Sequence, residues 1–302
     1  MHADEITAPD TREEITSFPN YPGYIRAWTV FKRRGFSASC GAVWRQDIET
    51  TLNKFLKTEP PQDIRVLSIG PGNGTMDEPL IDTLSNMTTS KVVYCAIDPD
   101  SAYLQEFREL AASRSDDWKN IEIEFRVESM EEYSDVWDKC EKKDKFNLIF
   151  ASYVIYHFRD AKATLVKMNE MLENNGIMYF KIVSGGWSKL MAYWNKFYYD
   201  SSCKINRHSP ELVKSMILDV MPNAKLQVLD RNADVDITEC FEEGSENGKL
   251  MLDFLMQMKD FKSVASPERR DQLIQFLKDE CCEAKGDRIM LSCTDQHVYF
   301  IK

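Results

Sequence analysis

The chain has 302 residues, and 49 Asp and Glu against 38 Lys and Arg give it a formal net charge of −11 at pH 7. Because this acidic balance repels phosphate backbones, we expect no nucleic-acid partner. No apolar run approaches the roughly 18 residues needed to cross a bilayer, and the polar N-terminus lacks a signal-peptide core. We therefore expect a cytoplasmic protein without a membrane partner. The eight cysteines form no C-x-x-C pair or ligand spacing, which predicts reduced thiols and no metal.

Alternating strand and helix patterns predict a doubly wound α/β fold with a parallel sheet. After a tail over residues 1–23, a helical stretch is expected over about 24–57. Asp160 is expected to cap the helix that begins there, and Asn174-Asn175-Gly176 to end it. The remaining elements are expected as helices over 76–86, 101–113 and 160–173, and as strands near 64–69, 92–97, 121–127, 146–151, 176–183, 288–292 and 297–301.

One domain over residues 24–302 is expected, with a cofactor-binding core at about 62–184 and substrate-side additions at about 24–57 and 185–285. The second addition begins with the densest aromatic run of the chain, residues 187–199. Its aromatic side chains occupy more than one face of a helix. This pattern fits a helix sandwiched between two layers, and it equally fits the apolar lid of a small-molecule pocket.

A glycine turn follows the first strand, with Gly70, Gly72 and Gly74 in a G-x-G-x-G pattern. Glycines there allow the backbone to turn sharply and to approach a ligand closely. The next strand stops on Asp98, whose carboxylate can accept hydrogen bonds from a ribose diol. The turn lacks the sixth-position glycine of the dinucleotide fingerprint, and Pro79 falls in the first turns of the next segment. We therefore expect S-adenosylmethionine as the cofactor, with an NAD-dependent dehydrogenase as the alternative.

The end of the fourth strand is aromatic and weakly polar, with Tyr153, Tyr156, His157 and Phe158. Aromatic faces attract a sulfonium or ammonium cation by about 0.5 to 2 kcal/mol. The segment lacks the acid or asparagine followed by two prolines that base-amine methylation uses, and the carboxylate cluster that a magnesium-dependent catechol enzyme needs. His157 fits either a structural role or that of a general base near neutral pH.

Ser129 and Met130 follow the third strand, where an adenine ring would lie. Ser129 could hydrogen-bond to that ring and Met130 could make an apolar contact with it. A plain helix cap at this strand-to-helix junction explains Ser129 equally well.

Several blocks of the chain resemble the histamine N-methyltransferase family: residues 64–74, 160–165 and 183–190, and above all 236–241, 246–248 and 252–255. The resemblance runs from about residue 24 to the C-terminus, and generic methyltransferases do not share its last block. It implies a seven-stranded, S-adenosylmethionine-dependent, cytosolic and monomeric enzyme that methylates a small amine. By position, it places cofactor contacts at Gly70, Asp98, Ser129 and Ser152, an aromatic substrate wall at Tyr156, Trp187 and Phe197, and a pocket cysteine at Cys203.

The chain departs from this family at the substrate. The family's N-terminal glutamate falls within residues 33–40, where no acid is present. Its strand-four glutamine aligns with Tyr153, its C-terminal asparagine with Ser292-Cys293, and one of its paired tyrosines is His157 here. We therefore predict an N-methyltransferase of a small amine or amino-containing metabolite other than histamine. The alternatives are a small-molecule O-methyltransferase and a cofactor-binding protein without catalysis.

The predicted site has three parts. The catalytic candidates are His157 and Tyr153. The cofactor-binding candidates are Gly70, Gly72, Gly74, Asp98, Ser129, Met130 and Ser152. The substrate-binding candidates are Tyr24, Ser37, Tyr153, Tyr156, His157, Trp187, Met191, Phe197, Cys203, Ser292 and Cys293.

Overall fold

A twisted sheet organises the chain in its computed structural model, which describes residues 23–56, 63–197, 209–256 and 258–302. The strand order is β3-β2-β1-β4-β5-β8-β6, with the short β7 paired to β8. Strands β1 to β5 are parallel, whereas β8 runs antiparallel to both β5 and β6. The strands are β1 Asp63–Ile69, β2 Lys91–Ile97, β3 Ile121–Arg126, β4 Phe146–Ser152, β5 Leu172–Ser184, β6 Gln227–Asp236, β7 Cys282–Lys285 and β8 Arg288–Ile301.

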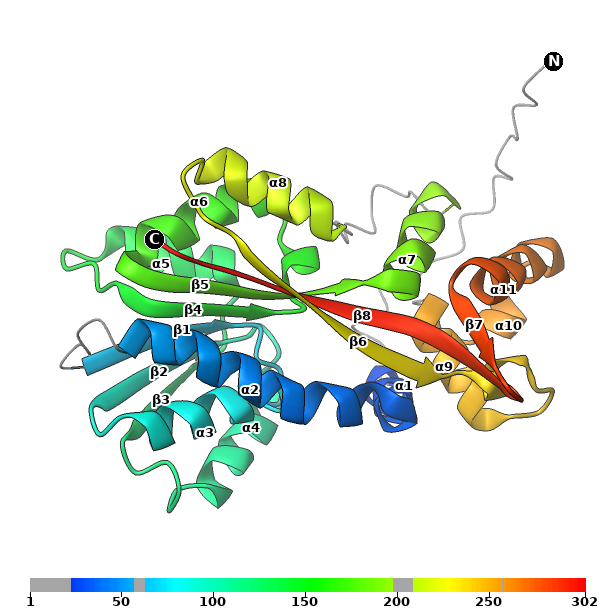
Figure 1. The fold of residues 1–302 in the computed structure, drawn as a ribbon, viewed down its shortest axis with the longest axis horizontal. Helices are drawn as coiled ribbons and strands as arrows, with labels where there is room; N and C mark the ends of the chain where they lie inside the picture. Colours follow the sequence, from blue (N-terminus) through cyan, green and yellow to red (C-terminus); the bar gives the residue numbers. More distant parts are fainter. Residues whose placement is uncertain (1–22, 57–62, 198–208, 257) are drawn as a thin grey trace.

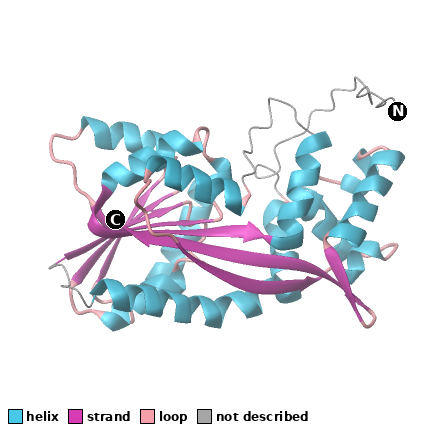
Figure 2. Ribbon diagram, turned by 45° about the horizontal axis from the view of Figure 1, so that its top comes forward, coloured by secondary structure: helices cyan, strands magenta, loops and turns pink. Residues whose placement is uncertain are grey.

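Helices cover both faces of this sheet, with α2, α3 and α4 on one face and α5, α6 and α8 on the other (Figures 1 and 2). This arrangement confirms the predicted doubly wound α/β class. The strand order reverses between β1 and β4, the position where such sheets bind ligands. The helices are α1 Tyr24–Phe31, η2 Lys32–Phe36, α2 Ser37–Leu56, α3 Glu78–Met87, α4 Ser101–Ser113, α5 Met130–Lys139, η3 Ile155–His157, α6 Ala161–Met171, α7 Gly185–Phe197, α8 Pro210–Val220, η4 Thr238–Phe241, α9 Glu246–Met256, α10 Phe261–Val264 and α11 Pro267–Glu280. In the described part of the chain, no helix combines the length and the apolar character needed to cross a bilayer.

The long strands β6 and β8 run beyond the parallel strands toward a helical lobe formed by α1, α7, α9, α10, α11 and β7 (Figure 1). An aromatic cluster joins three of these helices: the ring of Trp187 on α7 lies 5.3 Å from that of Phe31 and 5.2 Å from that of Phe254. On another side of α7, Tyr193 stacks on Phe276 at 3.8 Å. Helix α7 is thus packed on two sides, as the sandwiched-helix interpretation of the aromatic run predicts.

Several predicted boundaries were wrong. The two strands expected at 288–292 and 297–301 are one strand, β8. Strand β6 was missed because its charged residues hide any apolar alternation. The N-terminal helical stretch is kinked at Gly35, where φ is 133° and an added Cβ would lie 2.5 Å from the carbonyl oxygen of Asp234. Asp160 caps α6 as predicted. The predicted helix end at Asn174-Asn175-Gly176 was wrong, because α6 ends at Met171 and residues 174–176 lie within β5, where Asn175 has a left-handed backbone at φ 65°.

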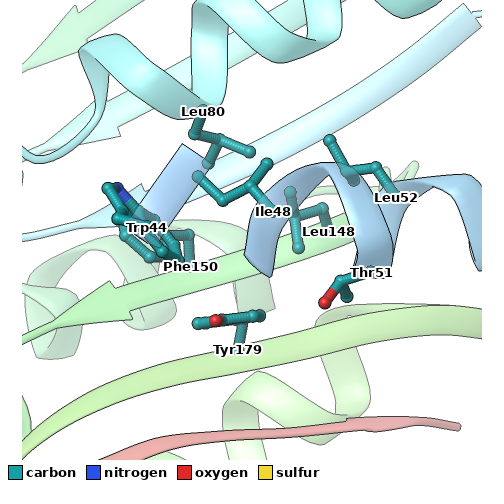
Figure 3. A pocket seen from close by; sticks show the side chains of 8 residues that line it. All are labelled: Trp44, Ile48, Thr51, Leu52, Leu80, Leu148, Phe150 and Tyr179. Carbon is teal, nitrogen blue, oxygen red and sulfur yellow. The ribbon is translucent and has the colours of Figure 1, made fainter. Parts of the chain in front are cut away.

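Helix α2 packs on the sheet through an apolar stripe (Figure 3). A cavity of about 10 Å³ lies beneath it. Even one water needs roughly 10–15 Å³ and polar partners, so this cavity belongs to the core and is not a ligand site. It is lined by Trp44, Ile48, Thr51, Leu52, Leu80, Leu148, Phe150 and Tyr179.

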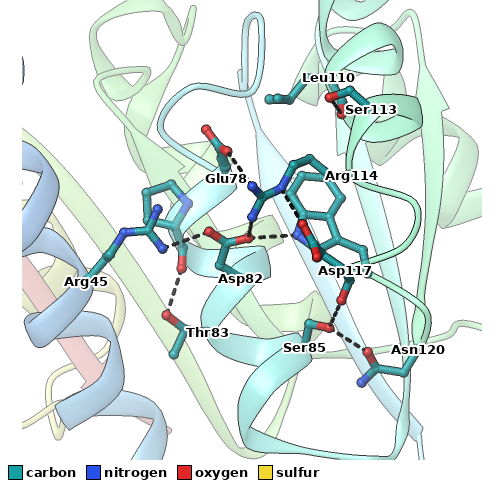
Figure 4. A network of polar contacts seen from close by, with 12 residues as sticks. Arg45, Glu78, Asp82, Thr83, Ser85, Leu110, Ser113, Arg114, Asp117 and Asn120 are labelled. Atoms are coloured by element: carbon teal, nitrogen blue, oxygen red, sulfur yellow. Dashed lines mark hydrogen bonds and ion pairs between the residues drawn. The ribbon is translucent and has the colours of Figure 1, made fainter.

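A buried carboxylate joins α2, α3 and α4 on the same face. Asp82 accepts hydrogen bonds from Arg45 at 2.7 Å, from Arg114 at 2.6 Å and from the Trp118 indole at 2.8 Å (Figure 4). Three donors from two other segments satisfy this acid, which stabilises a buried charge that would otherwise be costly. The network fixes α3, whose N-terminal end follows the glycine turn.

Candidate functional site

The three glycines of the turn after β1 all have positive φ, between 56° and 77°. An added Cβ at Gly74 would lie 2.2 Å from the Phe107 ring, and one at Gly70 would lie 2.6 Å from Val154. Those two glycines therefore permit close packing against α4 and against the end of β4. At Gly72 an added Cβ would meet no atom within 4 Å. Gly72 is thus the glycine that leaves open space beside the backbone, as an approaching ligand requires.

Asp98 lies beside this turn, at the end of β2. The main-chain N–H of Gly72 donates to Asp98 Oδ2 at 3.0 Å, and that of Asp100 donates to Asp98 Oδ1 at 2.9 Å. Burial raises the pKa of this carboxyl, although both hydrogen bonds oppose the rise. Each carboxylate oxygen can accept a further hydrogen bond, so the acid can still hold a diol while it orients the turn.

Sequence reasoning missed Asp77, which lies at the base of the turn. Its side chain is fully buried and accepts hydrogen bonds from Ser68 and, at 2.7 Å, from the Tyr94 hydroxyl. Its main-chain N–H donates to the Gly74 carbonyl at 3.0 Å. Burial, opposed by these side-chain hydrogen bonds, raises the pKa of Asp77 to about 6. The acid therefore supports the turn from within the core.

The end of β4 carries two predicted site residues. Ser152 is buried, and its hydroxyl has no hydrogen-bond partner among the described residues. Tyr153 follows in the left-handed region, at φ 55°. The Tyr153 hydroxyl donates to Asp295 Oδ2 at 2.5 Å, and its main-chain N–H donates to the Lys181 carbonyl at 3.0 Å. A non-glycine residue with this backbone conformation is strained, which is frequent at functional sites.

Asp295 belongs to a buried cluster of ionisable groups under α2 that sequence reasoning also missed. Lys181 and Asp295 are each 1% exposed, and His297 and Asp47 are also buried. His297 Nδ1 lies 3.0 Å from Asp47 Oδ2, and Arg231 Nε donates to the same oxygen at 2.7 Å. Lys181 interrupts an otherwise apolar strand, and this was the available sequence signal.

Other predicted residues have structural contacts. The Tyr156 hydroxyl is buried and accepts a hydrogen bond from the Val183 N–H at 2.6 Å, and burial raises its pKa. Ser129 caps α5 in a capping box with Glu132, as the alternative interpretation stated. Met130 is part of the core beneath it.

The predicted substrate residues differ in their surroundings in the described structure. His157 is exposed, Met191 is half-buried, and Trp187 and Cys293 are buried in the core around the helical lobe. Ser292 lines a polar pocket between β6, β7 and β8 that no other predicted substrate residue lines. The side chains of Tyr24, Ser37 and Phe197, and the whole of Cys203, lie outside the described residues.

Within the described ranges, no group of three or more His, Cys, Asp or Glu side chains is arranged to hold a metal ion.

Comparison with known proteins agrees with this geometry. The chain is 25% identical over 278 residues to histamine N-methyltransferase of Danio rerio, covering 90% of this chain and 92% of that protein. It is 28% identical over 269 residues to histamine N-methyltransferase A of Xenopus laevis, covering 87% and 89%. Among solved structures, the plantazolicin methyltransferase BamL in complex with a triazolic desmethylPZN analog and SAH shares the fold. Its TM-score is 0.51 and its identity 14%, and the match covers 95% of this chain and 93% of that one.

A family model described as "Methyltransferase domain" matches residues 43–238, well over half of the chain. That range includes the glycine turn, Asp98 and the end of β4. The chain therefore belongs to the methyltransferase domain family.

Proposed function

We propose that this chain is an S-adenosylmethionine-dependent N-methyltransferase that acts on a small amine or amino-containing metabolite. The observation that carries the proposal is the pairing of Gly72 with Asp98 at the point where the strand order reverses. Similarity to histamine N-methyltransferases over most of both chains supports a small amine as the substrate class.

The residues present fit this cofactor. Gly72 leaves open space at the turn, the Asp98 carboxylate can accept from a ribose diol, and the buried Ser152 hydroxyl lacks a partner among the described residues. Asp98 and the backbone of Gly70 and Gly72 would hold the nucleoside, with Ser152 as a further contact. When bound, the cofactor supplies a methyl group on a positively charged sulfur.

The protein's task is then to position a nitrogen that has a free lone pair. An ammonium has none, so the substrate must lose a proton before or during methylation. Most of the acceleration of methyl transfer can come from alignment and excluded water. His157 is exposed and Tyr153 is half-buried beside the turn. This difference favours Tyr153, of the two catalytic candidates, as the group that faces a bound amine.

Calorimetry and an activity screen test the proposal. We expect both S-adenosylmethionine and S-adenosylhomocysteine to bind, and a panel of small amines and phenols to show S-adenosylhomocysteine release with amines. Failure of both nucleosides to bind below millimolar concentration would contradict the cofactor assignment. Turnover of phenols alone would instead indicate O-methylation, and binding without turnover would favour a protein without catalysis. A monomeric state and a cytoplasmic location stay predictions.

A further inference from the structure

We propose that Tyr153 and Asp295 together accept the proton that the substrate ammonium loses, with Tyr153 in contact with the amine and Asp295 as the buried acceptor behind it. The inference deepens the proposed function and rests on it.

The geometry places this pair between the end of β4 and the core. Asp295 lies on β8 opposite Val183 of β5, two residues before His297, which lies opposite Lys181. The 2.5 Å hydrogen bond from the Tyr153 hydroxyl to Asp295 Oδ2 is short enough for a proton to pass along it. Tyr153 remains partly exposed next to the glycine turn, whereas Asp295 is 1% exposed. One end of the pair can therefore meet a ligand, and the other end is shielded from water.

The strain at Tyr153 gives a second, independent observation. A tyrosine at φ 55° is strained and keeps this conformation only where its surroundings stabilise it. Its main-chain hydrogen bond to Lys181 and its hydroxyl bond to Asp295 hold it in this conformation. Asp295 therefore also acts as a positioning residue that aims the tyrosine.

Ionisable groups from several elements lie around this pair. Lys181 of β5 lies 4.7 Å from the ring centre of Trp44 and 5.1 Å from that of Tyr153. Asp47 of α2 pairs with Arg231 of β6. His297 of β8 has a pKa that burial lowers, and Asp77 lies at the start of α3.

The ammonium of Lys181 therefore lies over two aromatic rings. When Asp295 takes up a proton, the ammonium of Lys181 keeps both cation–π contacts. Transient neutralisation of the acid thus does not leave a buried cation without support.

A proton moves from the substrate ammonium to the Tyr153 hydroxyl oxygen while the tyrosine's own proton moves to Asp295 Oδ2. The freed lone pair on nitrogen forms the bond to the methyl carbon, the sulfur–carbon bond breaks, and its electron pair stays on sulfur. The proton on Asp295 returns through Tyr153 to water after the product leaves.

Two variants and two matched controls test the pair. Tyr153→Phe and Asp295→Asn remove the relay with little change of shape. The control for Tyr153→Phe is Tyr179→Phe. Tyr179 lies on β5, on the face that α2 covers, and its buried hydroxyl has no hydrogen-bond partner in the described structure. Asp253→Asn changes a buried carboxylate of α9 that accepts from main-chain N–H groups of residues 260 and 261. Melting curves and S-adenosylhomocysteine calorimetry check that each variant folds and binds; if Asp295→Asn does not fold, Tyr153→Phe carries the test.

The pH profile of kcat/KM is the deciding measurement, with the most active alkylamine and the most active aromatic amine from the panel. At pH 7.5 we expect both relay variants to lose about a hundredfold on the alkylamine, which is protonated there, and less than about threefold on the neutral aromatic amine. The loss on the alkylamine should shrink as the pH rises toward the amine's own pKa.

A loss that is constant with pH, an equal loss on both amines, or activity equal to that of the controls would overturn the relay. An absence of turnover of any amine by the wild-type protein contradicts the proposed function instead, and it is seen before any variant is made.

Discussion

The main-chain N–H of Gly72 donates to the carboxylate of Asp98 at 3.0 Å, which joins the turn after β1 to the end of β2. The acid therefore orients the glycine turn as well as offering acceptors to a ligand. A turn that the protein's own hydrogen bonds hold in place loses less conformational freedom when a ligand binds, which reduces the ordering cost of binding.

A comparison of Gly72→Ala with Gly286→Ala separates the effect of backbone strain from the effect of filling the space in which a ligand would lie. Gly286, in the turn between β7 and β8, has φ 66°, and an added Cβ there also meets no atom within 4 Å. Because alanine is strained at positive φ, both variants should lose about 1 kcal/mol of unfolding free energy. We expect calorimetry to show weakened S-adenosylhomocysteine binding for Gly72→Ala alone. Equal affinity of the two variants would place the ligand elsewhere.

Asp98→Ala should weaken cofactor binding by roughly 2 to 4 kcal/mol, because two charge-assisted hydrogen bonds to the ribose would be lost. Asp100→Ala is the matched control two residues away. Asp100 caps α4 by accepting from the N–H groups of Ala102 and Tyr103, so its removal should cost about 1 kcal/mol of stability and leave binding unchanged. Wild-type affinity in folded Asp98→Ala, measured by calorimetry, would contradict the ribose assignment.

The fold was predictable where local patterns and chain order agree. The glycine turn, the strand that stops on Asp98 and the helix over 101–113 are all where the sequence places them. Strand β6 could not be predicted, because its exposed charged residues pair with β8 and show no apolar alternation.

The positions of the residues expected on the cofactor side were predictable because these residues lie close to strand ends, and their contacts with the cofactor stay a prediction. Lys181, Asp295 and Asp47 were missed because they come from three separate elements and meet only through β5–β8 pairing and the packing of α2. Tyr156 was assigned to the substrate wall from the resemblance, but its hydroxyl bonds to the main chain of Val183. The sequence pattern does not show whether the hydroxyl of a buried tyrosine already has a hydrogen-bond partner in the main chain.

Asp77 predicts a pH dependence of stability. Its pKa is about 6 in the folded protein, above the roughly 3.9 of an unfolded chain, so the folded state holds the extra proton between these values. The stabilising contribution is complete below about pH 4 and is lost as the pH rises through 6, on the order of 3 kcal/mol in all. Urea unfolding of the wild type and of Asp77→Asn should show their difference changing in this window.

Asp47 provides a control of opposite sign. Burial opposes its charged form, but hydrogen bonds from Arg231 and His297 outweigh this and lower the pKa of Asp47 to about 2. The contribution of Asp47 to stability is present above about pH 4 and is lost as the pH falls through 2.

A difference in unfolding free energy between wild type and Asp77→Asn that stays constant from pH 4 to pH 8 would show that Asp77 does not titrate as described.

Histamine should be a poor substrate, although the relatives are histamine N-methyltransferases. Where that family is expected to grip its ligand with a glutamine, this chain has Tyr153. The Tyr153 hydroxyl already donates to Asp295, so it has no hydrogen left to donate to an imidazole. The acid is likewise absent from residues 33–40, and Ser292 faces a separate polar pocket between β6, β7 and β8.

Each lost hydrogen bond to a polar ligand costs on the order of 1 to 3 kcal/mol, and sites built on such bonds discriminate strongly through them. The loss of three should lower kcat/KM for histamine at least about a hundredfold relative to the best amine of the panel. Asp47 and Glu49 are the acids of α2 that could have replaced the missing glutamate. The Asp47 carboxylate is buried and paired with Arg231, and Glu49 is exposed. Steady-state rates of S-adenosylhomocysteine release with histamine decide the matter. An efficiency equal to that of the best amine would mean that other groups of this chain, within or beyond the described residues, bind the imidazole.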